Sequence, residues 1–559
     1  MKKFKRILLI VIGITVVLLI IAGFFANSII EKEVKDYIDN ELPKNIETTY
    51  GNIKVNTFAG NISIDNIHLT VKDTILGTVM SEFDLKKFSI NNIGYLKYLK
   101  NDQIHLKEIV FDELNAKYYQ VEKKEENKNK EYKKDIPLLI EEIKFNNSSV
   151  IVYENIQDTV LLSTKNINFS IINVLFNERT SYQKIPFDYE SYSLSTDSLF
   201  VKTGKYNILK INHIKDKNKK LSLVGIDFKT KYSKKELSKI IPFEKDHYIA
   251  SADSVVFNNF EHGFSNNTFF LNTSVLEVDN AILEIYRDKL VKDDVTPKDL
   301  FSKSIRELPF KLKIDSVYIN EANIYYSQKK FVSNPTGNMK IRVTEATVAN
   351  LGNTYSSPNK TIILADAIFM KNTPLHANWS FDVNNENDEF EFIGDLGKIS
   401  GKDINVLLTP LINAKLKGDI DHTIFNIKGN NYTSMIYMSQ KYEHIKIEVL
   451  NKQKKNNKFV SSIANIIIHR KSGNKKGEYN HITADASRDL IKGFFNFLVV
   501  NLKSAATVSF LKKKNKKYKH HKNHVDLKKY HDEYVRNKKS RLKKKESRKK
   551  GKKGRKKKR

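Results

Sequence analysis

A phrase of alternating apolar and polar residues returns along the chain and restricts the fold more than any other feature. Residues 313–326 read KIDSVYINEANIYY, and related phrases are ADSVVFNNF from 252 and TDSLFVKTGKYNI from 196. Looser versions are IEEIKFNNSSVIVY from 140 and LKEIVFDELNAKYY from 106. Apolar residues at every second position predict β-strands with one apolar face. Because no acid, base or nucleophile is shared by all five phrases, we interpret the phrase as an architectural unit.

Proline-containing tripeptides precede four copies of the phrase, namely IPL, IPF, IPF and LPF. Each copy then presents an apolar pair: Ile143 and Phe145, Leu199 and Val201, Val255 and Phe257, and Val317 and Ile319. Repeated strands must bury their apolar face against something. We therefore predict a mainly β fold, in which an elongated, curved, repetitive sheet with short connecting helices forms a groove. The four pairs are the candidate residues for a lane that contacts lipid along this groove. An ordinary protein core is the alternative.

Capping residues and prolines predict two short helices. In YSKKELSKIIPF, Ser233 and Glu236 have the spacing of a capping box, and Pro242 ends the helix. In TPKDLFSKSIRELPF, Thr296 is the expected cap of a helix that stops before Pro309.

The amino terminus predicts a membrane anchor. Residues 7–26 carry no charge, and a helix of this length spans the roughly 30 Å hydrocarbon layer. A cleaved signal peptide is the alternative, but the run is long and ends in Phe24-Phe25-Ala26, which is a poor cleavage site. A buried soluble helix is a further alternative. The basic residues before the run favour a cytoplasmic amino terminus and an exported body.

The net charge of +32 is concentrated at the carboxy terminus. Residues 512–559 hold 26 Lys and Arg and four acidic residues, so this tail carries +22 and the other residues +10. We expect the tail to be disordered and to bind anionic lipid headgroups. Nucleic acid would also bind it, but the predicted export of the chain disfavours this partner. A solvated extension without function is the third interpretation. His520 and His524 have the spacing of helical metal ligands, but so basic a segment does not favour a metal.

Several classes of chemistry are excluded or disfavoured by the sequence. The chain of 559 residues has no cysteine, which excludes disulfides, thiolate metal sites and a cysteine nucleophile. It has no glycine-rich phosphate loop, no His-Glu-x-x-His and no Gly-x-Ser-x-Gly. The Asp-Ser pairs at 197, 253 and 315 lack a neighbouring histidine and are interpreted as turn or bend residues. We therefore predict neither an enzyme nor a cofactor.

The anchor, the segment GNISIDNIHLTV, the recurring phrase and a carboxy-terminal block together resemble the AsmA-like family of bacterial envelope proteins, in the form typical of the Bacteroidota. The block comprises GDLGKISGKDINVLLTPLINAKLKGDIDHTIFNIKGNNYTSMIYMSQKYEHIKIEVL, SSIANIIIHR and RDLIKGFFNFLVVNLKSAATVSF, between residues 394 and 510. The resemblance covers roughly residues 1–511 and extends to groove-forming lipid-transfer proteins. It implies an inner-membrane anchor, a periplasmic β structure with a hydrophobic groove, and a role in phospholipid movement or outer-membrane assembly. The family offers no catalytic residues to carry over, and the tail departs from its pattern.

Residues 489–511 are apolar and precede the basic tail, so a second membrane span has to be considered. Asn496, Asn501 and Lys503 make this span costly, since a central Lys costs about 2.5–3.5 kcal/mol on insertion scales. A capping or membrane-surface helix followed by a strand is the favoured interpretation.

The sequence thus predicts four regions: a cytoplasmic end and transmembrane anchor (1–30), a repetitive β region (31–330), an AsmA-like β region with a closing helix (331–511) and the tail (512–559). The predicted protein is a single-pass inner-membrane protein with a periplasmic body. It supports outer-membrane lipid homeostasis by carrying phospholipid acyl chains along an apolar groove. The alternative is an envelope scaffold that docks protein partners without lipid transfer.

Overall fold

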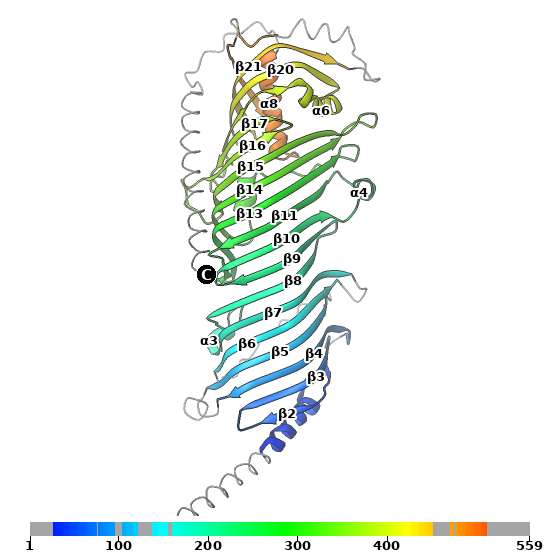
Figure 1. Cartoon of the computed structure of the whole chain (residues 1–559), viewed down its shortest axis with the longest axis vertical. Helices are drawn as coiled ribbons and strands as arrows, with labels where there is room; N and C mark the ends of the chain where they lie inside the picture. Colours follow the sequence, from blue (N-terminus) through cyan, green and yellow to red (C-terminus); the bar gives the residue numbers. More distant parts are fainter. Residues whose placement is uncertain are drawn as a thin grey trace, which may run out of the picture. The chain divides into compact units, whose positions relative to one another are not determined.

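The computed structural model describes residues 26–74, 76–94, 103–120, 137–154, 159–450, 470–473 and 477–510. These residues are mainly β, as predicted, and their strands all belong to one sheet (Figure 1). The strands of the amino-terminal half are β1 (Ile46–Thr49), β2 (Ile53–Asn56), β3 (Asn61–Lys72), β4 (Val79–Ile93), β5 (Ile104–Tyr119), β6 (Leu138–Tyr153), β7 (Val160–Phe176), β8 (Ser191–Thr203), β9 (Asn207–Lys217), β10 (Lys220–Thr230), β11 (Asp246–Asn258) and β12 (Glu261–Ser265). The remaining strands are β13 (Thr268–Asp288), β14 (Lys311–Lys329), β15 (Gly337–Gly352), β16 (Thr361–Phe369), β17 (Thr373–Phe381), β18 (Phe390–Leu396), β19 (Ile399–Ser400), β20 (Ala414–Gly429), β21 (Thr433–Val449) and β22 (Asn480–Ser487).

The chain divides into two compact units. The first contains residues 1–295, 301–372 and 380–386, and the second contains 296–300, 373–379 and 387–559. This division does not coincide with the sequence-based boundary after residue 330, since β15 and β16 belong to the first unit.

The first unit is a succession of antiparallel neighbours interrupted by two parallel pairs, β5–β6 and β13–β14. Two of the recurring phrases lie side by side in the first of these pairs, where Phe111 is opposite Phe145 and Tyr119 is opposite Tyr153. A parallel neighbour requires a crossover connection, which explains the long segments between these strands. The recurring phrase is therefore architectural, as predicted.

Many strands of the first unit contain a residue in the left-handed conformation, and these residues align across the sheet. Glu113 and Asn147 are aligned between β5 and β6, and Asn280 and Glu321 between β13 and β14, with φ between 46° and 61°. Asn adopts this conformation more readily than most residues, which accounts for its frequency here. The left-handed residue turns each strand, so the aligned strands change direction together. Further members of this line are Asn66, Asn166, Ser198 and Gly225.

The short helices of the first unit are α3 (Glu178–Ser181), α4 (Lys234–Ile240) and α5 (Phe301–Arg306). Helix α4 confirms the predicted capping box, because Ser233 accepts a hydrogen bond from the Glu236 amide and Glu236 accepts one from the Ser233 amide. The predicted start of the next helix at Thr296 was wrong, since α5 begins at Phe301. Residues 26–36 are also helical and continue into η1 (Tyr37–Glu41).

The second unit packs two helices against antiparallel strands. Helix α6 (Gly401–Ile412) is capped by Ser400 and ends at Asn413, which is left-handed. Helix α8 (Phe494–Phe510) lies against β21 and β22 and is held by a hydrogen bond from Ser434 to Asn501 of 2.8 Å (Figure 1). The strand predicted at the end of this segment was wrong, because the chain stays helical to Phe510.

The predicted anchor at 7–26 lies outside the described residues except for Ala26, and the tail at 512–559 lies outside them entirely, together with His520 and His524. None of the helices within the described ranges combines the length and apolarity that a membrane crossing requires.

Candidate functional site

One face of the first unit is lined by apolar residues, and we call it the apolar face. Along β6 and β14 its residues advance by two positions, with two three-residue steps in each strand, of which one contains the left-handed residue Asn147 or Glu321. In β14 the sequence of steps is Leu312, Ile314, Val317, Ile319, Ala322, Ile324 and Tyr326. In β6 it is Leu138, Ile140, Ile143, Phe145, Ser148, Val150 and Val152. The three-residue step at Asn147 or Glu321 keeps the alternation on the same face after the left-handed residue.

The strand register joins these residues into rows that cross the first unit. Side chains of residues that are directly opposite on neighbouring strands lie on the same face. One row contains a residue from each of β3 to β11 and β13 to β16, in the order Ile64, Phe88, Phe111, Phe145, Phe169, Leu194, Asp216, Leu221, Phe257, Leu276, Val317, Val348 and Ile363. All of these residues except Asp216 are apolar.

The structure places the eight predicted lane residues on this face. Phe145, Phe257 and Val317 belong to the row given above. Val255 and Ile319 lie in the next row, since both are opposite Val278. Val255 and Ile319 do not lie on neighbouring strands, because β13, which does not carry the recurring phrase, pairs with both β11 and β14.

The remaining predicted residues lie elsewhere on the apolar face. Ile143 is opposite Ile109 and Ile171. Leu199 and Val201 lie beyond the turn at Ser198, opposite Ile211 and Leu209. The residues of β8 that match the middle rows are therefore Leu194 and Thr196, which the sequence pattern did not single out.

The opposite face of the same strands is polar. Lys144 pairs with Glu108 at 2.7 Å and Glu142 at 2.9 Å, and Ser170 donates a hydrogen bond to Glu142. The pKa of Glu108 is lowered, first by its hydrogen bond from Lys144 and then by that from Asn91. The sheet is thus amphipathic, with charged networks on one side and apolar side chains on the other.

The apolar face is half-buried rather than sealed. Val317 is 5% exposed, whereas the other seven predicted residues retain intermediate exposure. Within the described ranges all strands belong to one hydrogen-bonded sheet. Aromatic rings line part of it in succession, with Phe88, Phe111, Phe145, Phe169 and Tyr192 at centroid distances of 4.5 to 6.4 Å.

Asp216 is the one charged residue in the row, and it is only 5% exposed. The hydroxyl of Tyr192 donates a 2.6 Å hydrogen bond to its carboxylate, and His262 Nε2 lies 2.7 Å from the same hydroxyl. Because this hydroxyl gives its proton to Asp216, the imidazole is the donor to Tyr192. Burial, followed by the hydrogen bond to Asp216, raises the pKa of Tyr192 above its ordinary value. The trio satisfies a buried charge inside an apolar row.

Comparisons with protein-family models, curated proteins and solved structures found no match to this chain. A broad face of aliphatic and aromatic side chains binds apolar chains without directional contacts. The Asp-Ser pairs lie within β8, β11 and β14. Ser198 is left-handed, as its interpretation as a bend residue requires, whereas Ser254 and Ser316 are paired in strand register and are not left-handed. The expectation that no histidine neighbours these pairs was wrong for Asp197, because the fold brings His213 Nδ1 to 2.7 Å from its carboxylate.

Proposed function

We propose that the first unit carries phospholipid acyl chains on its apolar face and so supports lipid homeostasis of the outer membrane. The observation that supports this proposal is the apolar row from Ile64 to Ile363, which lies on one face of a sheet whose other face is charged. A core that served only stability would be closed by a second layer.

The energetics of such a face suit a long, flexible chain. Each CH₂ group that leaves water for the apolar face gains about 0.8 kcal/mol, so an acyl chain needs no polar recognition. Because the rows continue from strand to strand, a bound chain meets a similar surface at neighbouring positions. The free energy then varies little along the row, which favours movement over tight retention.

The proposal includes the topology expected from the sequence. Residues 7–26 anchor the chain in the inner membrane, the body is periplasmic, and the tail 512–559 binds anionic headgroups. The protein acts as a carrier and not as an enzyme.

The test uses two adjacent valines on opposite faces of β11. Val255 is opposite Val278 and lies on the apolar face, whereas Val256 is opposite Glu277 and lies on the polar face. A photo-crosslinking amino acid is placed at one or the other position of the full-length chain in cells that export it. Lipid adducts are then identified by mass spectrometry.

We expect lipid adducts at Val255 and few at Val256. Protein adducts alone at Val255 would contradict lipid carriage and support an envelope scaffold. Equal lipid adducts at both positions would show non-specific exposure to membrane and would also contradict the proposal.

A further inference from the structure

The loops at one edge of the first unit combine exposed lysines with exposed apolar side chains, and we call this edge the α4 rim. It consists of residues 204–206, 231–245, 289–295 and 330–334. The register places these loops together, because Asn207 is opposite both Thr203 and Thr230, and Arg287 is opposite both Asp246 and Gln328. Helix α4 marks this edge in Figure 1.

The apolar side chains of the rim lie at the tips of its loops. Val332 is 79% exposed and Val295 is 65% exposed. Ile240, Phe243, Leu290 and Phe331 are also exposed. Single exposed apolar residues are common on protein surfaces, but a group on adjoining loops marks an interaction site.

The charge of the rim is mainly positive. Its exposed lysines are Lys205, Lys231, Lys234, Lys235, Lys239, Lys245, Lys292 and Lys330. Its exposed acids are Glu236, which caps α4, and Asp293, which pairs with Lys289 at 3.5 Å. An acidic surface is therefore the complementary partner.

Several rim lysines lie over aromatic rings. The ammonium of Lys292 is 5.2 Å from the ring centre of Phe243, and that of Lys330 is 5.3 Å from Phe331. Lys205 and Lys245 both approach the ring of Tyr206. In this arrangement the methylene groups cover apolar surface and the charge stays near water, as at a membrane interface.

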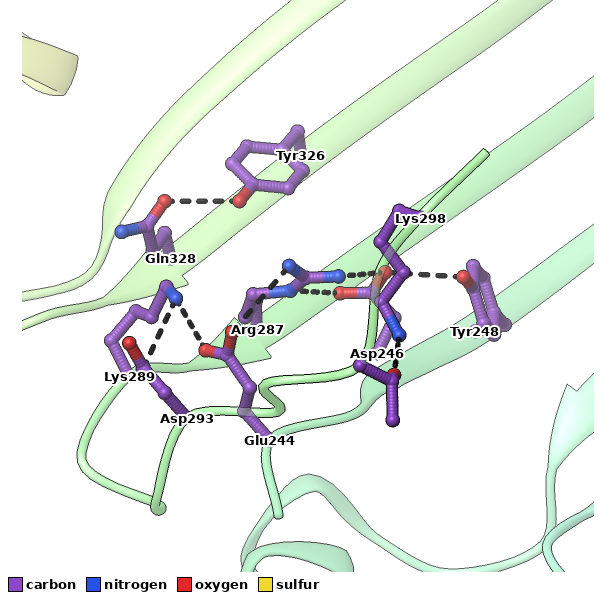
Figure 2. A network of polar contacts seen from close by, with 10 residues as sticks. Glu244, Asp246, Tyr248, Arg287, Lys289, Asp293, Lys298, Tyr326 and Gln328 are labelled. Carbon is purple, nitrogen blue, oxygen red and sulfur yellow. Dashed lines mark hydrogen bonds and ion pairs between the residues drawn. The ribbon is translucent and has the colours of Figure 1, made fainter. Parts of the chain in front are cut away.

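A partly buried ion network braces the rim (Figure 2). Arg287 donates two hydrogen bonds of 2.6 Å to Asp246, Lys289 contacts Glu244 at 2.5 Å, and Tyr248 donates to Asp246 at 3.1 Å. Burial disfavours the charged guanidinium, but the contacts with Asp246 outweigh it and raise the pKa of Arg287. The pKa of Tyr248 is raised to about 12, first by burial and then by the charge of Asp246. These contacts tie the loop before β11 to the end of β13.

We infer that the α4 rim docks on the surface of an anionic phospholipid bilayer. The apolar tips enter the headgroup region and the lysines contact lipid phosphates, while the ion network holds the loops in place. A flat bilayer suits the rim better than a folded partner, because its apolar residues are dispersed over several loops and its lysines surround them. This inference does not depend on what the apolar face carries.

The experiment uses the absence of cysteine from the sequence. A single cysteine is introduced into the full-length chain at Val332 and labelled with an environment-sensitive fluorophore. A matched control carries it at Tyr182, which is 68% exposed in the connection between β7 and β8. Vesicles of phosphatidylglycerol and phosphatidylcholine, or of phosphatidylcholine alone, contain lipids with a fluorescence quencher in the acyl chain. Quenching reports insertion of the labelled loop, whereas tethering by the tail brings the chain close without inserting Val332.

We expect quenching at Val332 on anionic vesicles, less on neutral vesicles, and none at Tyr182. Changing Lys235, Lys239, Lys292 and Lys330 to Gln removes four positive charges. Each charge strengthens partitioning of the protein from water to an anionic membrane by about fivefold, or about 1 kcal/mol. The midpoint lipid concentration for quenching should therefore rise at least tenfold. The same number of Lys→Gln changes at Lys165, Lys215, Lys217 and Lys220, outside the rim, should leave it within twofold.

Absence of quenching at Val332, or equal quenching at both labels, would overturn the inference. Equal quenching on neutral vesicles would overturn the anionic preference. A spectral shift with soluble polyglutamate but not with vesicles would replace the bilayer by an acidic protein partner.

Discussion

The hydrogen bond between Tyr192 and Asp216 offers a test of the apolar row, because it satisfies a charge that the row would otherwise leave buried. Changing Tyr192 to Phe removes the donor and keeps the ring. A hydrogen bond to a charged group contributes about 1.5–3 kcal/mol. Since Tyr192 is only half-buried, we expect the change to destabilise β8 to β10 by about 2 kcal/mol.

The partner substitution should behave differently. Asp216→Leu replaces the carboxylate by an apolar side chain of the kind found on both sides of it, Leu194 and Leu221. Burial of a leucine contributes about 1.5–3 kcal/mol, and the Tyr192 hydroxyl keeps His262 as a partner. We therefore expect no loss of stability, and Tyr192→Phe in this background should cost less than about 0.5 kcal/mol. The difference between the two backgrounds is the coupling energy.

Hydrogen exchange read by mass spectrometry measures the local stability change, since it gives opening free energies for peptides from β8 to β10. Peptides from β20 and β21 in the second unit serve as an internal control. Unchanged exchange in Tyr192→Phe would refute the reasoning. The reasoning would also be refuted if Asp216→Leu lowered the opening free energy of β8 to β10 as much as Tyr192→Phe does. In that case the carboxylate would itself stabilise the strands, and the Tyr192 hydrogen bond would not merely offset the cost of burying it.

Three further predictions concern the turns, one buried histidine and helix α8. Glu321 has φ of 61°, so Glu321→Gly should stabilise β14 by about 1 kcal/mol and Glu321→Val should destabilise it by about 1–2 kcal/mol, as measured by hydrogen exchange. The pKa of His247 is lowered, chiefly by burial, so the folded state stays neutral while the unfolded state takes up a proton below about pH 6.5. The stability that neutral His247 contributes is therefore present above that pH and is lost as the pH falls toward the folded pKa. Hydrogen exchange of β11 peptides should rise over this interval. A His247→Gln variant that keeps the same pH dependence would contradict the assignment to His247. Asn501 is fully buried and accepts a hydrogen bond from the Ser434 hydroxyl, so Asn501→Leu should weaken the docking of α8 by about 1–3 kcal/mol. Trp379 stacks on Phe494 of α8 at 4.3 Å, so its fluorescence should change at a lower denaturant concentration in the variant. Asn501→Leu with an unchanged Trp379 transition would show that this hydrogen bond does not hold the helix.

Local signals in the sequence were sufficient for the strands and for α4. The strand at Ile143 and Phe145 could be predicted from two apolar residues two positions apart, and helix α4 could be predicted from the four residues of the capping box, Ser233 to Glu236. The start of α5 was not predictable in the same way, because Thr296 has cap chemistry but belongs to a segment that packs with the second unit. A cap residue does not form a helix where tertiary contacts favour an extended chain.

By itself, the sequence determined that this chain forms amphipathic strands, since the period of apolar residues decides which local conformation can bury them. The tertiary structure decided which strands are neighbours and where each strand turns. Leu199 and Val255 both follow an Asp-Ser pair, yet the turn at Ser198 assigns them to different rows. Asp216 is unremarkable in the sequence, but the register places it between Leu194 and Leu221. The physical reason is that register depends on pairing between distant strands and on the left-handed residues that shift the alternation, and neither is contained in the local pattern.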